Sequence, residues 1–301
     1  MFRRTTVLAC AVGALLALPA AGHAAPVVGI GDQQASMFTN PLYEALDVPI
    51  VRYIAPYDAI DSGVDARRAD AFISAAQAAG AKVLVAFYHS RMSPEKLPST
   101  AKYRRAVKKF IAAFPYVREY QPWNEANRGN EPGLFRSPNP RQAANYYMAL
   151  RKACRGCTVT GLDMLDGANM APTLRYLKQF QRYAKPAPKI WGLHNYSDTN
   201  RNSSTRTRAI LAATKGELWL TETGGIVKFG SNFPGGSKGQ RRASKALRYM
   251  FKLADSSSRI KRLYIFQWTG STSSARFDAG LTNPNGTARP GYRVLKSRIG
   301  R

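Results

Sequence analysis

Residues 116–125, with the sequence YVREYQPWNE, form an apolar, strand-like run that ends in Trp123-Asn124-Glu125. A second run of this kind, Glu217-Leu218-Trp219-Leu220, ends in Thr221-Glu222-Thr223. In both places the glutamate stands where the strand gives way to a loop rich in Gly or Asn. If the two strands belong to one parallel barrel, both carboxylates face the same mouth, because the functional side chains of a barrel gather at the carboxyl ends of its strands.

The rest of the chain repeats the alternation of short apolar runs with amphipathic helical stretches. Asp65–Ala79 has Ala, Phe and Ile at helical spacing, and Pro140–Ala153 opens with Asn139 as N-cap. Pro290–Ile299 gives a last helix. Eight strand–helix units predict an α/β fold, a (β/α)8 TIM barrel. The strand candidates are Val27–Gly31, Ile50–Ala55, Lys82–Tyr88, Val117–Trp123, Thr158–Leu162, Ile190–His194, Leu218–Thr221 and Arg262–Trp268.

The first residues predict a secretory signal peptide over residues 1–24. Arg3-Arg4 is a basic start, Val7–Leu18 is apolar, and small residues precede a cleavage point after Ala24. The apolar run is too short to span a membrane. A lipoprotein signal that ends at Cys10 is the weaker alternative, because this cysteine comes too early in the apolar run. We therefore expect an exported, extracellular protein.

The mature chain, residues 25–301, is expected to form one domain, since it contains no Gly/Ser linker, repeat or low-complexity tract. We also expect a monomer. Its two cysteines are Cys154 and Cys157. In a cytosolic protein this spacing would indicate redox chemistry or half of a zinc site. For an exported chain without a second cysteine pair, we predict a local disulfide at the end of a helix.

The formal net charge of +27 is large for a chain of 301 residues. A positive charge of this size is typical of proteins that bind nucleic acid, an anionic membrane or an acidic cell-wall polymer. The basic residues are spread along the polar faces of helical segments, as in Arg104-Arg105 and Lys108-Lys109. A solvated basic surface therefore explains them better than a nucleic-acid groove. We expect no nucleic-acid partner and no membrane partner after signal cleavage, while an anionic cell-wall polymer stays open.

Two motifs resemble those of clan A of the retaining glycoside hydrolases, the 4/7 superfamily. They are Trp123-Asn124-Glu125 at the fourth strand candidate and Thr221-Glu222 at the seventh. The resemblance spans the whole barrel and includes the tail that begins at Gly280-Leu281. It implies that Glu125 is the acid/base and that Glu222 is the nucleophile. Glycoside hydrolysis uses two such carboxylates. Glu131 is the nearby competitor of Glu125, but it lies beyond the strand end.

The resemblance also implies the groups around the two glutamates. Arg52 and Tyr196 are expected against the nucleophile, with ordinary salt bridging as the alternative. Asn124 resembles the clan's ligand for the sugar 2-hydroxyl, and a strand-end cap is its alternative. Apolar surroundings, supplied by Trp123, should raise the pKa of the acid/base.

Further residues should line the substrate cleft. Trp268 resembles the tryptophan that forms the floor of the sugar site in this clan, although an ordinary buried Trp is the alternative. His194 should line the cleft and bind substrate, as should Trp123. At Tyr88-His89, the end of the third strand candidate, it stays open which of the two reaches substrate. Asp32 and Asp163 stay open between sugar binding and a structural role.

The resemblance implies a secreted retaining β-glycoside hydrolase that acts on a β-linked polysaccharide or oligosaccharide and needs no cofactor and no metal. Two alternatives stay open: a non-catalytic carbohydrate-binding protein and a basic cell-wall adhesion protein, both on a TIM barrel. A full catalytic set, with Arg52 and Tyr196 beside both glutamates, favours the enzyme. The residues do not distinguish glucan, mannan, xylan and galactan as substrates.

Overall fold

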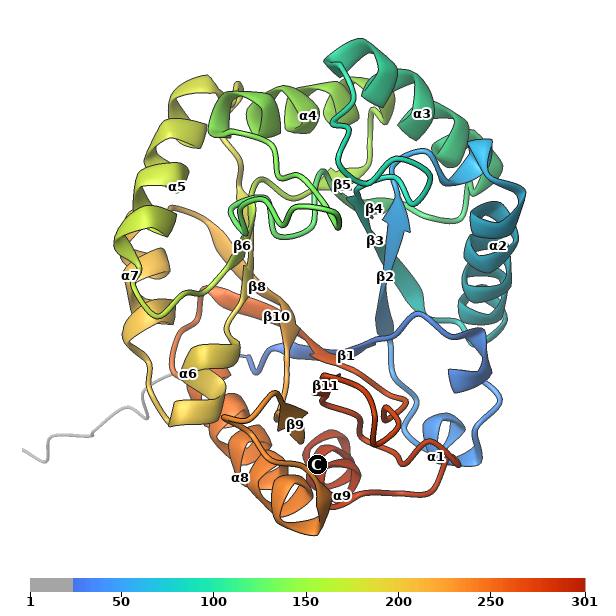
Figure 1. Ribbon diagram of the computed structural model, residues 1–301, viewed down its shortest axis with the longest axis vertical. Helices are drawn as coiled ribbons and strands as arrows, with labels where there is room; N and C mark the ends of the chain where they lie inside the picture. The colour runs from blue at the N-terminus through green and yellow to red at the C-terminus, as the bar shows by residue number, and fades with distance from the viewer. Residues whose placement is uncertain (1–23, 301) are drawn as a thin grey trace, which may run out of the picture.

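The computed structural model describes residues 24–300 of the chain (Figure 1). The predicted signal peptide therefore lies outside the described residues, except for its last residue, Ala24. No helix in the described part is both long enough and apolar enough to cross a membrane.

Nine parallel strands form one sheet that curls into a barrel, with helices on its outside (Figure 1). The order in the sheet is β5-β4-β3-β2-β1-β10-β8-β7-β6. Each strand therefore pairs with a strand on both sides, except β5 and β6, which are the two ends of the sheet. This confirms the predicted (β/α)8 fold. The strands are β1 (Val27–Gly31), β2 (Ile50–Pro56), β3 (Lys82–Tyr88), β4 (Glu119–Gln121), β5 (Thr158–Val159), β6 (Asp163–Leu165), β7 (Ile190–His194), β8 (Glu217–Thr223) and β10 (Ile260–Phe266).

Two short strands share the fifth position of the barrel. β5 pairs with β4 and β6 pairs with β7. Between them, the backbone N–H groups of Thr160 and Gly161 donate to the strands on either side, at 3.0 and 2.8 Å, and so close the barrel. The sequence predicted one strand, Thr158–Leu162. The strand breaks where the chain passes closely over Pro188, since a Cβ on Gly161 would lie 2.5 Å from the Pro188 Cβ.

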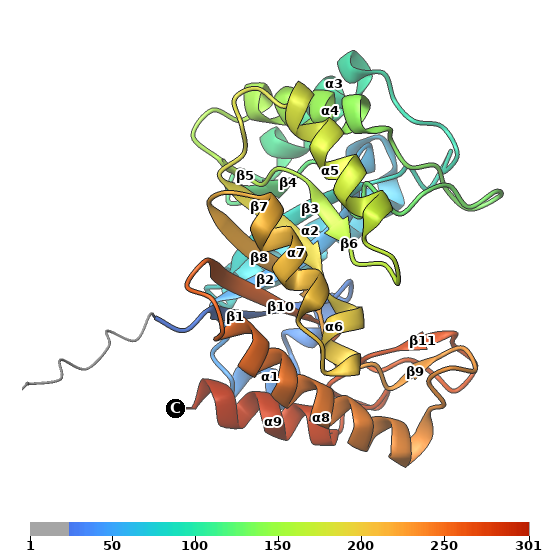
Figure 2. The same ribbon diagram turned by 90° about the vertical axis from the view of Figure 1, so that its left-hand side faces the viewer.

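The helices cover the outer face of the barrel (Figures 1 and 2). As predicted, Asn139 caps the helix that starts at Pro140, and its Oδ1 accepts a hydrogen bond from the Gln142 N–H at 2.9 Å. The helices are α1 (Pro41–Glu44), α2 (Gly63–Ala78), α3 (Thr100–Ala113), α4 (Pro140–Ala153), α5 (Ala171–Tyr183), α6 (Tyr196–Arg201), α7 (Thr205–Ala213), α8 (Gly236–Ala254) and α9 (Pro290–Ile299), with 3-10 turns at Ala35–Met37 and Ala59–Asp61.

Side chains inside the barrel stack in layers. Ile50, Leu84, Trp219 and Tyr264 form a separate buried apolar cluster. Ile50 lies two residues before Arg52 on β2, and side chains two apart on a strand point to the same face. The apolar cluster therefore fills the barrel one layer below Arg52 and keeps water from the floor of the site above it.

A small antiparallel ribbon stands over the mouth. It consists of β9 (Lys228–Phe229), from the loop after β8, and β11 (Phe277–Asp278), from the loop after β10. Figure 2 shows the ribbon projecting from the barrel on the same side as the loop that follows β4. The two extensions therefore flank the end of the barrel where the strands finish.

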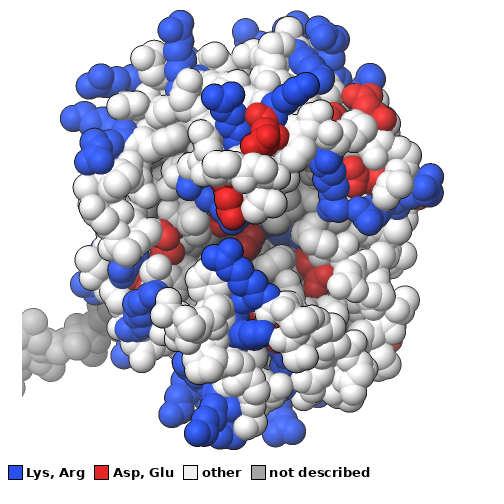
Figure 3. Space-filling model, viewed as in Figure 1, with Lys and Arg blue, Asp and Glu red and all other residues white. Residues whose placement is uncertain are grey.

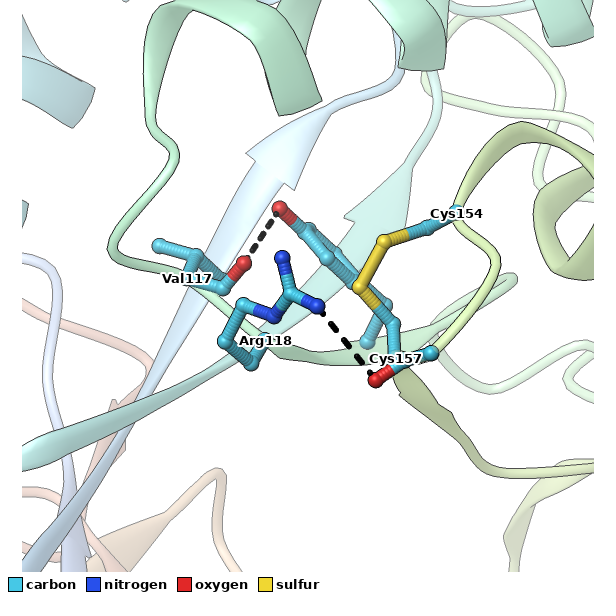
Figure 4. Close-up of a disulfide and its surroundings, with 6 residues drawn as sticks. Val117, Arg118, Cys154 and Cys157 are labelled. Atoms are coloured by element: carbon cyan, nitrogen blue, oxygen red, sulfur yellow. Dashed lines mark hydrogen bonds between the residues drawn. A yellow bond between two sulfur atoms is a disulfide. The ribbon is translucent and has the colours of Figure 1, made fainter.

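The predicted disulfide joins Cys154, the C-cap residue of α4, to Cys157, with their Cα atoms 5.5 Å apart (Figure 4). Nearby, the Arg118 Nη2 donates to the carbonyl oxygen of Gly156 at 3.5 Å. The disulfide fastens the end of α4 to the start of β5. Because it lies at the amino end of a barrel strand, it stands at the opposite face from the mouth.

Candidate active site

Arg52 is the centre of a buried hydrogen-bond network at the mouth, with 1% of its surface exposed. Its Nη1 donates to Glu222 Oε2 at 2.9 Å, and its Nε donates to Gln121 Oε1 at 2.7 Å. Its Nη2 donates to Asn124 Oδ1 at 2.6 Å and to Asp163 Oδ2 at 3.1 Å. A buried guanidinium is tolerated only where its donors are satisfied in this way. One arginine thus holds side chains from β4, β6 and β8 in fixed positions.

Glu222, on β8, has both of its carboxylate oxygens engaged by donors. Arg52 occupies Oε2, and the Tyr196 hydroxyl donates to Oε1 at 3.1 Å. Burial, and then the nearby charge of Glu222, raise the pKa of Tyr196 above its usual range, so the phenol keeps its proton and remains a donor. A cation and a hydroxyl directed at the two oxygens suit a carboxylate that must stay ionised.

Glu125, just after β4, lies in the left-handed region of backbone space with φ at 46°. This conformation is uncommon for a residue with a side chain and costs on the order of 1–3 kcal/mol. It points the carboxylate back over the barrel axis, where Oε1 lies 3.0 Å from His194 Nδ1. Oε2 accepts from Arg128 Nη1 at 3.2 Å.

The pKa of Glu125 departs from the sequence-based expectation. Burial raises it, but the hydrogen bond and charge of His194, together with the charge of Arg128, outweigh burial and leave the pKa below its usual value. The expectation of a raised pKa rested on the apolar side of the pocket and did not include these two cationic neighbours.

His194, at the end of β7, is fully buried between carboxylates. Its Nδ1 faces Glu125, and its Nε2 lies 3.1 Å from Asp163 Oδ2. Burial lowers the pKa of His194, but the charges of Asp163 and Glu222 raise it more, to about 10. Asp163 is itself held in place by the Thr221 hydroxyl, which donates to its Oδ1 at 2.5 Å. The raised pKa favours the protonated form of His194 at neutral pH, in which each ring nitrogen can donate to the carboxylate that it faces.

The position of Asp163 depends on a glycine. A Cβ on Gly192 would overlap Asp163 Oδ1, and it would lie 2.9 Å from both Gln121 Nε2 and Thr221 Oγ1. Gly192 stands two residues before His194 on β7, so it faces the same way into the barrel. The missing side chain at position 192 leaves the space that the Asp163 carboxylate occupies.

The three central groups are close together. One carboxylate oxygen of Glu125, one ring nitrogen of His194 and one carboxylate oxygen of Glu222 all lie within 4.8 Å of one another. Such a set contains ligands that a divalent cation accepts. However, the Arg52 guanidinium lies 2.9 Å from Glu222, and its charge opposes that of a second cation at this place.

The profile of the glycosyl hydrolase catalytic core family matches residues 120–292, more than half of the chain, and this span includes Glu125, His194 and Glu222. The chain belongs to this family. It is a glycoside hydrolase, as the sequence motifs indicated, and the enzyme interpretation is thus confirmed. No curated protein matches the chain.

Solved structures show the same fold at low sequence identity. A thermostable mutant of a xylanase (Xyn10A) from Cellvibrio japonicus is 14% identical, with a TM-score of 0.64 over 92% of this chain and 99% of that chain. GH5_18 from Streptomyces cattleya, in complex with GlcNAc, is 13% identical, with a TM-score of 0.63 over 93% and 80%. A glucosidase from Croceicoccus marinus is 16% identical, with a TM-score of 0.66 over 93% and 68%.

The two tryptophans expected at the substrate lie in the core of the enzyme. Trp123 and Trp268 are each 1% exposed. Trp268 packs edge-on against Tyr43, with ring centroids 5.5 Å apart, and Trp123 stacks on Tyr146 at 5.2 Å. The alternative of an ordinary buried Trp therefore describes their packing better, and we leave both out of the proposed sugar contacts.

Asp163, whose role was open, belongs to the central network, whereas Asp32, His89 and the competitor Glu131 lie around it. Asp32 accepts from the backbone N–H groups of Trp268 and Thr269, at 3.1 and 2.9 Å, and so anchors the loop after β10. Glu131 has 39% of its side chain exposed and lies 3.7 Å from Arg128, on the outer side of that arginine. His89 stacks on Phe135 at the rim, with ring centroids 5.8 Å apart.

Two functional neighbours were not predicted. The only signal of Gln121 in the sequence is that it is a polar residue within an apolar strand. Arg128 lies in a loop three residues past Glu125, where no periodicity fixes the direction of a side chain.

Charge is divided between the inside and the outside of the enzyme. Nine of the 18 acidic residues are buried, but only Arg52 and Arg289 are buried among the Lys and Arg residues of the described part. Figure 3 shows Lys and Arg side chains around the mouth and acidic side chains at its hollow centre. The exposed surface is therefore more basic than the composition alone indicates.

Proposed function

We propose that the enzyme is an exported retaining β-glycosidase in which Glu222 is the nucleophile and Glu125 is the acid/base. The observation that carries this proposal is that one carboxylate oxygen of Glu125 and one of Glu222 lie within 4.8 Å of each other. Retaining enzymes separate these groups by about 5–5.5 Å, whereas inverting enzymes separate them by about 6.5–9.5 Å to admit a water molecule.

In the first step, a Glu222 oxygen bonds to the anomeric carbon while the bond from that carbon to the glycosidic oxygen breaks. Glu125 gives a proton to the departing oxygen. The nearest proton for Glu125 is on His194 Nδ1, 3.0 Å away, and its transfer leaves His194 neutral with Nε2–H still directed at Asp163. In the second step, Glu125 removes a proton from water, which attacks the anomeric carbon and releases Glu222.

The surrounding residues have supporting roles in this proposal. Arg52 and Tyr196 hold the Glu222 carboxylate in position through hydrogen bonds of 2.9 and 3.1 Å. Asn124 Oδ1 accepts a hydrogen bond from Arg52 Nη2, which leaves the Asn124 amide nitrogen for the sugar 2-hydroxyl. His194 acts through Glu125 and is not proposed to contact the sugar.

The substrate class proposed is a β-linked polysaccharide or oligosaccharide. Among the solved structures with this fold are xylanases and a glucosidase, so xylan and β-glucans are the first substrates to test. The N-terminal pattern that ends at Ala24 and the disulfide of Cys154 and Cys157 support export. The basic surface supports an anionic cell-wall polymer as a further partner.

The test compares Glu222→Ala and Glu125→Ala on an activated aryl β-glycoside that the wild type cleaves. Without Glu222 no covalent intermediate forms, and added azide should give the α-glycosyl azide. Without Glu125 a good leaving group still departs, and azide should give the β product. Proton NMR of the product anomer distinguishes the two. Exchanged anomers would exchange the two roles, and unchanged rates in both variants would remove these glutamates from catalysis. Glu131→Ala is the matched control and should keep the wild-type activity.

A further inference from the structure

The ribbon of β9 and β11 carries two aromatic side chains on one face. Phe229 and Phe277 are directly opposite each other in its register, so their side chains point to the same side. Their ring centroids lie 5.9 Å apart. Phe277 is partly buried, whereas Phe229 is 40% exposed. In the described part, Phe229 and Tyr183 are the aromatic members of a small set of exposed large apolar side chains.

The aromatic pair on the ribbon is continuous with the catalytic centre. The ring of Phe277 packs edge-on against Tyr196, with centroids 5.8 Å apart. The hydroxyl of Tyr196 donates to Glu222 at 3.1 Å. Aromatic side chains therefore lead outward from the proposed nucleophile to the exposed ring of Phe229. A single exposed Phe needs no explanation, but one that continues an active-site wall marks a binding surface.

A pyranose ring is the ligand that this surface fits. Its axial C–H bonds pack on the face of an aromatic ring, while its hydroxyls need polar partners around the edge. Arg276 supplies such a partner, since the central carbon of its exposed guanidinium lies over one face of the Phe229 ring, 5.7 Å from the centroid. Guanidinium groups offer several N–H donors in one plane.

We propose that Phe229 and Phe277, together with Arg276, form a sugar-binding subsite that holds a ring of the glycan at a distance from the bond that is cleaved. The enzyme then requires a chain of several sugars for full activity. The proposal rests on the proposed function of Glu125 and Glu222, because the subsite is defined relative to them.

The first experiment measures kcat/KM against chain length. Cello-, xylo-, manno- and laminari-oligosaccharides of two to six sugars are compared with the 4-nitrophenyl monoglycoside. Phe229→Ala should lower kcat/KM for the longest cleaved oligosaccharide about tenfold through KM, which corresponds to the loss of one aromatic contact. The monoglycoside should change less than about twofold, and Phe229→Trp should restore the long-chain value.

Tyr183→Ala is the matched control. Tyr183 is an exposed aromatic residue at the end of α5, and Arg141 lies over its ring at 5.6 Å, so its setting is similar to that of Phe229 but on the outer wall. The control should leave the dependence on chain length unchanged. An equal loss on the monoglycoside and the hexasaccharide in Phe229→Ala, or the same loss in Tyr183→Ala, would overturn the proposal.

A binding measurement keeps this inference separate from the proposed mechanism. Glu222→Gln, with and without Phe229→Ala, is run in native gels that contain xylan, hydroxyethylcellulose or soluble β-glucan. Slower migration of Glu222→Gln that is lost in the double variant supports the subsite even if no hydrolysis is found. Hydrolysis by the wild type with equal migration of the two variants would retain the catalytic proposal and reject the subsite.

Discussion

His194 Nδ1 and Glu125 Oε1 are hydrogen-bonded at 3.0 Å, and both side chains are buried. Because the other ring nitrogen of His194 faces Asp163, we expect one proton to be shared between His194 Nδ1 and Glu125 Oε1. A pair that shares a proton titrates as a unit. The pair keeps this proton until the pH approaches the pKa of His194, about 10. The proton that Glu125 must donate to the leaving oxygen is therefore present on the His194–Glu125 pair throughout the neutral pH range.

His194→Gln should therefore narrow the pH range of activity. In the wild type, the alkaline limb of kcat/KM follows loss of the shared proton, whereas in the variant it follows Glu125 alone. We expect the alkaline limb to move to lower pH by more than about one unit, with a loss of rate at pH 7 of about 10²–10⁴, typical of impaired proton transfer. The measurement is kcat/KM from pH 4 to 10 on one aryl glycoside. An alkaline limb at the same pH in both proteins would contradict the shared proton.

The stability of the protein should also depend on His194 at alkaline pH. A histidine whose pKa is raised in the folded state stabilises the fold fully below its unfolded pKa of about 6.5, and this contribution is lost as the pH rises through about 10. The free energy of unfolding should therefore fall more between pH 7 and pH 10 in the wild type than in His194→Gln. Urea denaturation followed by Trp fluorescence tests this, since titration of Lys and Tyr is common to both proteins. Parallel falls would argue that His194 is neutral in the folded state.

Gly192→Ala should damage both stability and catalysis. The added methyl group overlaps Asp163 Oδ1, so the carboxylate must move away from Arg52 and His194. We expect a loss of about 1–3 kcal/mol in unfolding free energy and a lower kcat. Gly63→Ala is the control, because a Cβ there meets only the flexible end of Arg67, at 3.4 Å. Equal melting temperatures of wild type and Gly192→Ala would show that Asp163 has room to move.

The backbone at position 125 can be tested by a pair of substitutions that both remove the carboxylate. Glycine adopts a φ near 46° without strain, whereas alanine does not. Glu125→Gly should therefore be more stable than Glu125→Ala by about 1 kcal/mol, the reverse of the usual order of these residues. In a protein of this size, the difference is about 2–4 °C in melting temperature. A more stable alanine variant would show that the loop relaxes when the glutamate is absent.

The sequence predicted the barrel because its signal is local. Apolar runs that alternate with amphipathic helices, and caps such as Asn139, are visible without knowledge of tertiary contacts. The break in the fifth strand was not predictable, because it depends on the approach of Pro188 to Gly161 across the barrel wall. The ribbon over the mouth was also missed, since Lys228–Phe229 and Phe277–Asp278 are too short to show a period.

The site was partly predictable for the same reason. Strand ends gather at one mouth, so Arg52, Glu125 and Glu222 could be placed together from their positions in the pattern. Whether a tryptophan at a strand end faces the mouth or the core depends on the helices behind it, and Trp268 is buried against Tyr43. The charge on Glu125 depends on loop geometry, which the sequence does not reveal.

The division of charge between the inside and the outside of the enzyme makes its adsorption and its turnover respond to different conditions. Since half of its carboxylates are internal, few titratable acids are left outside, and the exterior keeps nearly the same charge from mildly acidic to mildly alkaline solution. Adsorption to a negatively charged material should then follow the salt concentration and hardly follow the pH. Turnover follows the pH through Glu125 and His194. A change of pH would thus alter the turnover rate without releasing the enzyme from a negatively charged material. A change of salt concentration would alter its adsorption to that material without altering the catalytic step.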